Sequence, residues 1–128
     1  MPVRSILIVE DNADAREALR MLLELDGHAV EAAAEGVEAL EIARAKDLDI
    51  ALVDIGLPGI DGYEVARRVR ARDRRRPLLI ALTGYGQPED RRRATEAGFD
   101  SLLVKPVDPS ALSDLLATLE IPDRASRG

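Results

Sequence analysis

Short apolar runs alternate along this chain with longer segments in which apolar residues recur every three or four positions. The runs begin near residues 5, 29, 50, 78 and 101. All but the second are nearly continuous stretches of valine, leucine, isoleucine and alanine. Such runs are typical of parallel strands covered by helices on both faces. The pattern therefore predicts five strands.

The segments after these runs have the periodicity of amphipathic helices. Their apolar positions are, in chain order, Ala15, Ala18, Leu19, Leu22 and Leu23; Val37, Ala39, Leu40 and Ala43; Val65, Ala66 and Val69; Ala94 and Ala97; and Ala111, Leu112, Leu115, Leu116 and Leu119. Five β–α units with right-handed crossovers predict an α/β fold. We expect a single doubly wound, five-stranded parallel sheet with helices on both faces.

Polar residues stand where four of the predicted strands end. Glu10 and Asp11 follow the first run, Asp54 the third, Thr83 the fourth and Lys105 the fifth. Each residue alone has an ordinary explanation as a helix cap or a turn residue. Parallel strands, however, end at one edge of their sheet, where open α/β sheets bind ligands. We therefore expect all five side chains to share one cleft.

Three carboxylates in one cleft repel one another and raise each other's pKa. A hard divalent cation removes this penalty, and an all-oxygen site with few protein ligands suits Mg²⁺. One carboxylate can then attack an incoming phosphoryl group and form an aspartyl phosphate. An ammonium and a hydroxyl should surround that group, and Lys105 and Thr83 provide them. The cleft is thus predicted to be a metal-dependent phosphoryl site.

Composition narrows the possible functions. The chain has 128 residues, which suits one domain, and no cysteine, which excludes disulfides and thiol chemistry. A net charge of −6 and an aromatic content of 2% argue against nucleic-acid binding. We interpret the arginine clusters at 67–76 and 91–93 as solvated helix faces. With no apolar stretch of membrane-spanning length and no secretion signal, a cytoplasmic location fits.

Four motifs resemble the receiver domain of bacterial two-component response regulators, as in chemotaxis regulators. They are Val9-Glu10-Asp11-Asn12, the segment 53–64 with the sequence VDIGLPGIDGYE, Ala81-Leu82-Thr83-Gly84 and Val104-Lys105-Pro106. The resemblance spans residues 4 to 120 and keeps the order of the family's motifs. It implies a flavodoxin-like sheet with strand order 2-1-3-4-5.

The resemblance also implies a role for each site residue. Asp54 would be the phosphoacceptor, charged by the phosphohistidine of a sensor histidine kinase or a phosphotransfer domain. Asp11, Asp54 and the Gly56 carbonyl would ligate Mg²⁺ directly, and Glu10 would act through water. Thr83 and Lys105 would bind the phosphoryl oxygens. The family also usually has a cis peptide bond before the proline that corresponds to Pro106.

The chain departs from the family's pattern at Leu102, and Gly56, Tyr85 and His28 also need an interpretation. Leu102 replaces the aromatic residue that many receivers carry three positions before the lysine, so an aromatic rotamer switch cannot operate there in its usual form. Tyr85 is interpreted as a plain loop residue, and His28 as a surface or strand-entry residue rather than a phosphodonor. Gly56, two positions after the acceptor, has no side chain to block water, which leaves the phosphoryl lifetime open.

We therefore expect a receiver domain over residues 1–121 and a flexible tail over residues 122–128. It would stand alone or come from a hybrid histidine kinase, with a downstream protein as its target and no binding to nucleic acid or membrane. It would accept phosphate without being a turnover enzyme. One alternative is a pseudo-receiver that serves as a scaffold. The other is a haloacid-dehalogenase-like phosphatase, which would normally need a second aspartate at Gly56.

Overall fold

The computed structural model of the chain describes residues 3–119, in which five strands and five helices alternate. The strands are β1 (Ser5–Val9), β2 (Ala29–Ala33), β3 (Ile50–Asp54), β4 (Leu78–Thr83) and β5 (Ser101–Val104). The helices are α1 (Ala13–Leu25), α2 (Gly36–Ala45), α3 (Gly62–Arg72), α4 (Pro88–Ala97) and α5 (Pro109–Thr118). All five predicted strand starts are confirmed. The predicted tail, 122–128, lies outside the described residues.

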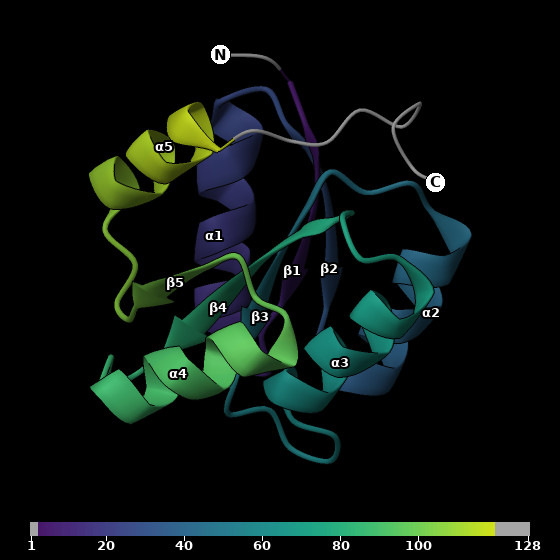
Figure 1. Ribbon diagram of the computed structural model, residues 1–128. Coiled ribbons are helices and arrows are strands. Elements are labelled where there is room, and N and C mark those ends of the chain that lie inside the picture. The colour runs from purple at the N-terminus through teal and green to yellow at the C-terminus, as the bar shows by residue number, and fades with distance from the viewer. Residues whose placement is uncertain (1–2, 120–128) are drawn as a thin grey trace.

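All strands pair in parallel, in the order β2-β1-β3-β4-β5 (Figure 1). This is the order that the resemblance implied. The register aligns Val9 with Ala33 on one side and with Val53 on the other, while Thr83 pairs with Val104. The carboxyl ends of the four site-bearing strands therefore lie at one edge of the sheet.

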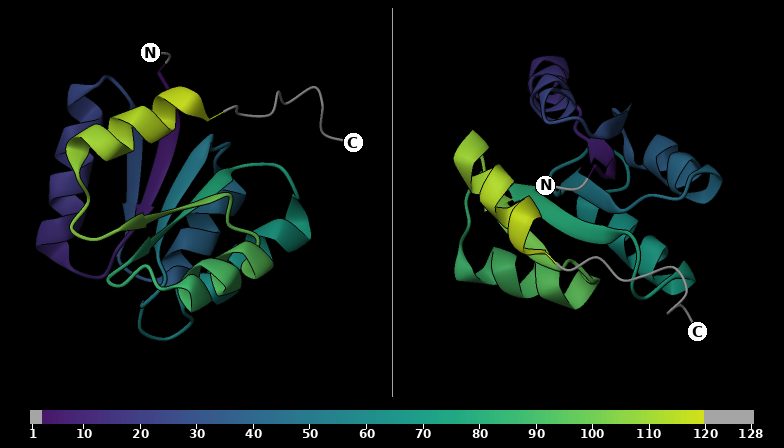
Figure 2. Two further views of the ribbon diagram at one scale, coloured as in Figure 1. Left: turned by 60° about the vertical axis from the view of Figure 1, so that its left-hand side comes forward. Right: turned by 90° about the horizontal axis from the view of Figure 1, so that it is seen from above.

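Two hydrophobic cores fill the space on the two sides of this sheet. Helices α1 and α5 cover one face, and α2, α3 and α4 cover the other (Figures 1 and 2). Successive strand residues point to opposite faces, so Ile6 and Ile8 enter the first core while Leu7 and Val9 enter the second. This division explains why the strands are continuously apolar.

Three residues of the predicted apolar helix faces are exposed rather than buried. Val37 is 51% exposed and does not belong to the core. The buried residues of α2 are Gly36, Ala39 and Leu40, a spacing that turns position 37 toward solvent. Ala18 and Ala111 are also exposed, which narrows the buried stripes of α1 and α5 to their leucines.

The prediction that residues 67–76 form a solvated face is wrong for two arginines. Arg76 is buried, and its Nη2 pairs with Asp49 Oδ1 in the loop before β3. Arg70 Nε donates to the Gly98 carbonyl at 3.0 Å, and its Nη2 lies 2.6 Å from Asp100 Oδ2. Arg76 joins the segment before β4 to the segment before β3. Arg70 joins α3 to the segment before β5.

His28 lies at the entry to β2, as predicted, but it is buried rather than on the surface. Its Nδ1 accepts a hydrogen bond of 3.0 Å from the Arg4 backbone N–H. The bond fastens the segment before β1 to the start of β2, so the residue has a structural role.

Within residues 3–119, none of the helices has the length and apolar character needed to cross a membrane.

Replacing Gly62 with alanine is expected to destabilise the fold, although alanine usually favours a helix. A Cβ at this position would lie 2.5 Å from the Asp54 carbonyl oxygen and 2.6 Å from Ile55 Cα, and neither backbone atom can yield cheaply. We expect a loss of about 1–3 kcal/mol in the free energy of unfolding, measured by urea denaturation. At Gly84 a Cβ would meet no atom within 4 Å. Gly84→Ala, the control, should change stability by less than about 0.5 kcal/mol. A Gly62→Ala protein as stable as the wild type would contradict this account.

Candidate functional site

The polar residues at the strand ends meet at the carboxyl edge of the sheet, the lower edge in Figure 1, as predicted. Glu10 and Asp11 follow β1, Asp54 ends β3, and Lys105 follows β5. One carboxylate oxygen from each of Glu10, Asp11 and Asp54 lies within 4.8 Å of the others. Three acidic side chains from two neighbouring strands therefore form a compact cluster of oxygen atoms.

Both carboxylate oxygens of Asp54 accept a hydrogen bond. The residue is 7% exposed; its Oδ1 accepts from the Gly56 N–H at 2.8 Å and its Oδ2 accepts from Lys105 Nζ at 2.8 Å. Burial alone raises the pKa of Asp54, but the hydrogen bonds from Lys105 and Gly56 outweigh it and hold this pKa below its usual value. Asp54 is therefore ionised at neutral pH, as a nucleophile or a metal ligand must be.

Glu10 is more deeply buried than Asp54, and its ionised form is less favourable. Its Oε2 accepts from the Asn12 N–H at 3.2 Å, and its Oε1 lies 2.6 Å from Lys105 Nζ. Burial raises the pKa of Glu10 further than the contact with Lys105 lowers it, and the neighbouring Asp54 adds to the rise. The environment thus favours an added positive charge beside this carboxylate.

Lys105 bridges the two buried carboxylates. Burial lowers its pKa, but its hydrogen bonds to Asp54 and Glu10 outweigh burial and raise the pKa above its usual value. The lysine is therefore charged, but one ammonium group faces a cluster of three carboxyl groups. A divalent cation would add the positive charge that this cluster favours, and the oxygen-only donor set fits Mg²⁺.

Thr83 ends β4, which lies between the strand that carries Asp54 and the strand that precedes Lys105. It is buried, and its hydroxyl oxygen accepts from the Tyr85 N–H at 3.2 Å, which leaves the hydroxyl proton available to a ligand. Its carbonyl accepts from the Lys105 N–H at 2.7 Å and so holds the two segments together. The Lys105–Pro106 peptide bond is cis, as the resemblance implied.

The structure also places the residues at which the chain departs from the family's pattern. Leu102 is half-buried and packs against the core beneath α2, α3 and α4. Tyr85 is 77% exposed, which agrees with its interpretation as a loop residue.

A mostly apolar groove beside the site was not predicted. It lies between α1 and the segment that joins β5 to α5, with a volume of about 590 Å³. Its lining consists of Glu10, Asn12, Ala15, Ala18, Leu19, Leu22, Leu82, Lys105, Pro106, Val107 and Pro109. The small residues of α1 and the two prolines were visible in the sequence, but only the fold brings them together.

Comparison with known proteins agrees with this geometry. The sequence profile of the response regulator receiver domain matches residues 6–117. The response regulator MprA of Mycobacterium sp. (strain KMS) is 40% identical over 119 residues, which cover 93% of this chain and 50% of MprA. The chain thus spans half the length of that relative.

Two solved structures share both the fold and part of the sequence. One is the receiver domain of the sensor histidine kinase PA1611 from Pseudomonas aeruginosa PAO1, with a magnesium ion coordinated in its active-site cleft. It has a TM-score of 0.80 and 33% identity, with 90% of this chain and 95% of that one covered.

The other structure is the complex of the Saccharomyces cerevisiae phosphotransfer protein Ypd1 with the receiver domain of the response regulator Ssk1. It has a TM-score of 0.86 and 29% identity, with 91% of this chain and 88% of that one covered. The strand order, the acidic cluster and the matched profile lead to the same conclusion: this chain belongs to the family of response regulator receiver domains.

Proposed function

We propose that this receiver domain takes a phosphoryl group from a phosphohistidine onto Asp54. An Asp54 oxygen forms the new bond to phosphorus while the P–N bond of the donor breaks and its electron pair returns to the imidazole. The observation that carries the proposal is the buried, ionised Asp54 beside the charged Lys105. Lys105 and the Thr83 hydroxyl then stabilise the charge that develops on the phosphoryl oxygens.

The proposal assigns Mg²⁺ to the acidic cluster. Asp11, Asp54 and the Gly56 carbonyl would hold the ion directly and Glu10 through water. When bound, the ion offsets the negative charge shared by the acceptor and the phosphoryl group. The cluster of three carboxylates supports this assignment, and the PA1611 receiver carries magnesium in its own cleft.

The donor is a sensor histidine kinase or a phosphotransfer protein, and the apolar groove beside Lys105 is its proposed docking place. A groove of this composition suits the apolar face of a helix. The Ypd1–Ssk1 structure shows that a receiver of this fold can bind a phosphotransfer protein. A downstream protein target, the absence of turnover catalysis and a cytoplasmic location remain parts of the proposal.

Asp54 is expected to be the acceptor in a labelling experiment. Wild-type protein incubated with acetyl phosphate and Mg²⁺ should gain one phosphoryl group, measured by intact mass, whereas Asp54→Asn should gain none. Asp114→Asn, which alters an exposed aspartate on α5, should label like the wild type. A wild type that takes no label would identify a pseudo-receiver, and release of many phosphates per chain would identify a phosphatase.

Replacing Lys105 with methionine is expected to strengthen Mg²⁺ binding. Its ammonium group lies 2.6 Å from Glu10 and 2.8 Å from Asp54 and repels a cation placed among the same oxygens. We expect the Kd for Mg²⁺, measured by calorimetric titration, to fall about tenfold, while labelling of Asp54 becomes slower. Lys46→Met, at the opposite edge of the sheet, should leave the Kd unchanged. Weaker Mg²⁺ binding by Lys105→Met would show that the lysine supports the metal site.

A charge in the apolar groove should separate protein donors from small ones. Ala18 lines the groove but is exposed, so Ala18→Glu should fold normally. Because an unpaired carboxylate in an apolar interface is unfavourable, we expect phosphotransfer from an active histidine kinase to slow about tenfold or more. Labelling by acetyl phosphate should not change. The exposed Ala71 on α3 provides the control, Ala71→Glu, and equal transfer rates for both variants would exclude docking at the groove.

A further inference from the structure

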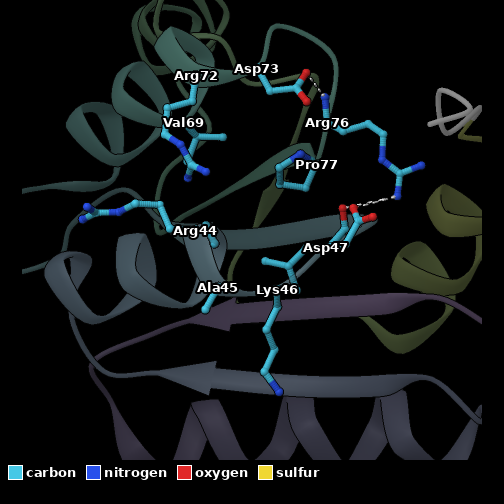
Figure 3. Close-up of a pocket in the computed structure, with 11 residues that line it drawn as sticks. Arg44, Ala45, Lys46, Asp47, Val69, Arg72, Asp73, Arg76 and Pro77 are labelled. Atoms are coloured by element: carbon cyan, nitrogen blue, oxygen red, sulfur yellow. Dashed lines mark hydrogen bonds and ion pairs between the residues drawn. The ribbon is translucent and has the colours of Figure 1, made fainter. Parts of the chain in front are cut away.

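A second hollow lies at the opposite edge of the sheet from Asp54, where α2 and α3 end and β3 and β4 begin (Figure 3). It has a volume of about 380 Å³. Its lining consists of Ala43, Arg44, Ala45, Lys46, Asp47, Leu48, Val69, Arg72, Asp73, Arg76 and Pro77. Four of these residues are cationic and two are acidic, in a chain whose net charge is −6. We call this hollow the basic groove.

The carboxylates around the basic groove already have partners. Asp73 Oδ1 accepts from the backbone N–H groups of Arg75 and Arg76, at 2.9 and 3.1 Å. Asp47 Oδ1 lies 3.8 Å from Arg76 Nη2, and the neighbouring Asp49 pairs with the same guanidinium. These acidic groups are therefore not available to neutralise the other arginines of the groove.

Two arginines of the groove are not paired with a carboxylate of the described residues. In the part of the chain that the structure describes, no carboxylate lies within ion-pair distance of Arg44 or Arg72. Figure 3 shows Arg72 reaching from α3 toward α2, whereas Lys46 turns away from the groove, and its Nζ pairs with Glu31. The uncompensated charge of the groove therefore comes from guanidinium groups.

Some exposed arginines elsewhere on α3 and α4 differ in this respect. Arg67 and Arg68 both pair with Glu64, at 3.1 and 2.9 Å, and Arg92 pairs with Glu89 and Glu96. These arginines pair with counter-charges at a spacing of three or four residues on their own helix. Among the described residues, Arg44 and Arg72 lack such pairs, as does Arg91 on α4, but Arg44 and Arg72 line one hollow together.

Helix dipoles act against an anion in the groove but do not cancel its charge. Both α2 and α3 end there, and each helix C-terminus carries roughly half a negative charge. Together they offset about one unit of positive charge, whereas Arg44 and Arg72, the two lining arginines without a carboxylate partner among the described residues, carry two. The exposed Arg74, which follows the end of α3, adds another positive charge nearby. The groove therefore stays positive.

We propose that the basic groove binds a small oligophosphate anion through Arg44 and Arg72. A guanidinium group binds phosphate oxygens with two parallel hydrogen bonds, and its charge does not titrate in the physiological range. The lining contains no aromatic side chain on which a nucleobase could stack, so the phosphate chain is the recognised part. The ligand would sit at the far end of the sheet from Asp54, and its binding does not depend on the proposed phosphoryl transfer.

The test uses the full chain in Mg²⁺-free buffer at low salt, with inorganic tripolyphosphate as the probe. Binding is followed by backbone amide NMR. We expect shifts concentrated in residues 43–48 and 72–77. The double variant Arg44→Glu/Arg72→Glu should weaken binding at least about tenfold. Arg76 is left unchanged because its buried ion pairs support the fold.

Arg91→Glu serves as a control for one charge reversal, because Arg91 is an exposed arginine of α4 outside the groove. It should bind tripolyphosphate with less than about a twofold change. Shifts centred on Glu10, Asp54 and Lys105, or equal weakening by both charge reversals, would overturn the proposal. So would tighter binding of a tri-glutamate peptide than of tripolyphosphate, since the groove would then be a docking place for an acidic protein segment. Thermal unfolding confirms that each variant is folded.

Discussion

Repulsion among three carboxylates at one edge of a parallel sheet is the physical constraint around which this site is built. Glu10 and Asp54 are both buried, and one ammonium group, that of Lys105, contacts both. The pKa values of the two carboxyls move in opposite directions, because burial outweighs the hydrogen bonds that Glu10 accepts, whereas the hydrogen bonds from Lys105 and Gly56 outweigh burial at Asp54. The arrangement keeps Asp54 ionised, and the cluster as a whole favours an added positive charge.

The fold holds this cluster with the backbone as well as with side chains. Lys105 reaches the carboxylates because its own N–H is bonded to the Thr83 carbonyl, which fixes the end of β5 beside β4. Asn12 donates its N–H to Glu10 and caps α1 with its side chain, so the helix start and the acidic cluster share one residue. Polar groups at the site are thus held by the same bonds that end the strands and begin the helices.

Much of this could be predicted from the sequence because the relevant signals are local. Strand starts, helix stops and the residue that follows each strand can all be recognised within a few positions. What could not be predicted depends on contacts between distant segments. Arg76 resembles its solvated neighbours until Asp49 is placed against it. The apolar groove beside the site exists only once Ala18 and Val107 lie across from each other.

The same limit applies to burial on a helix. Val37 has an apolar side chain but an exposed position, because the packing face of α2 is set by Gly36, Ala39 and Leu40. Gly36 itself lies against Ile60 and Val65, a close approach that no pattern along the chain reveals. It was therefore hard to predict from the sequence which small residues the packing requires. In the structure, a larger side chain at Gly36 would clash with its neighbours.

The close approach of Gly62 to the backbone of Asp54 has a mechanical consequence. The Gly62 N–H donates to the Ile55 carbonyl at 3.3 Å, and no side chain separates the start of α3 from the acceptor strand. Where two backbones are in direct contact, no side chain can change its rotamer to absorb a displacement. We therefore expect any shift of the main chain at Asp54 to be passed directly to the first turn of α3. This chain has Leu102 where the family's pattern leads us to expect an aromatic residue, and here the start of α3 lies directly against the backbone of Asp54.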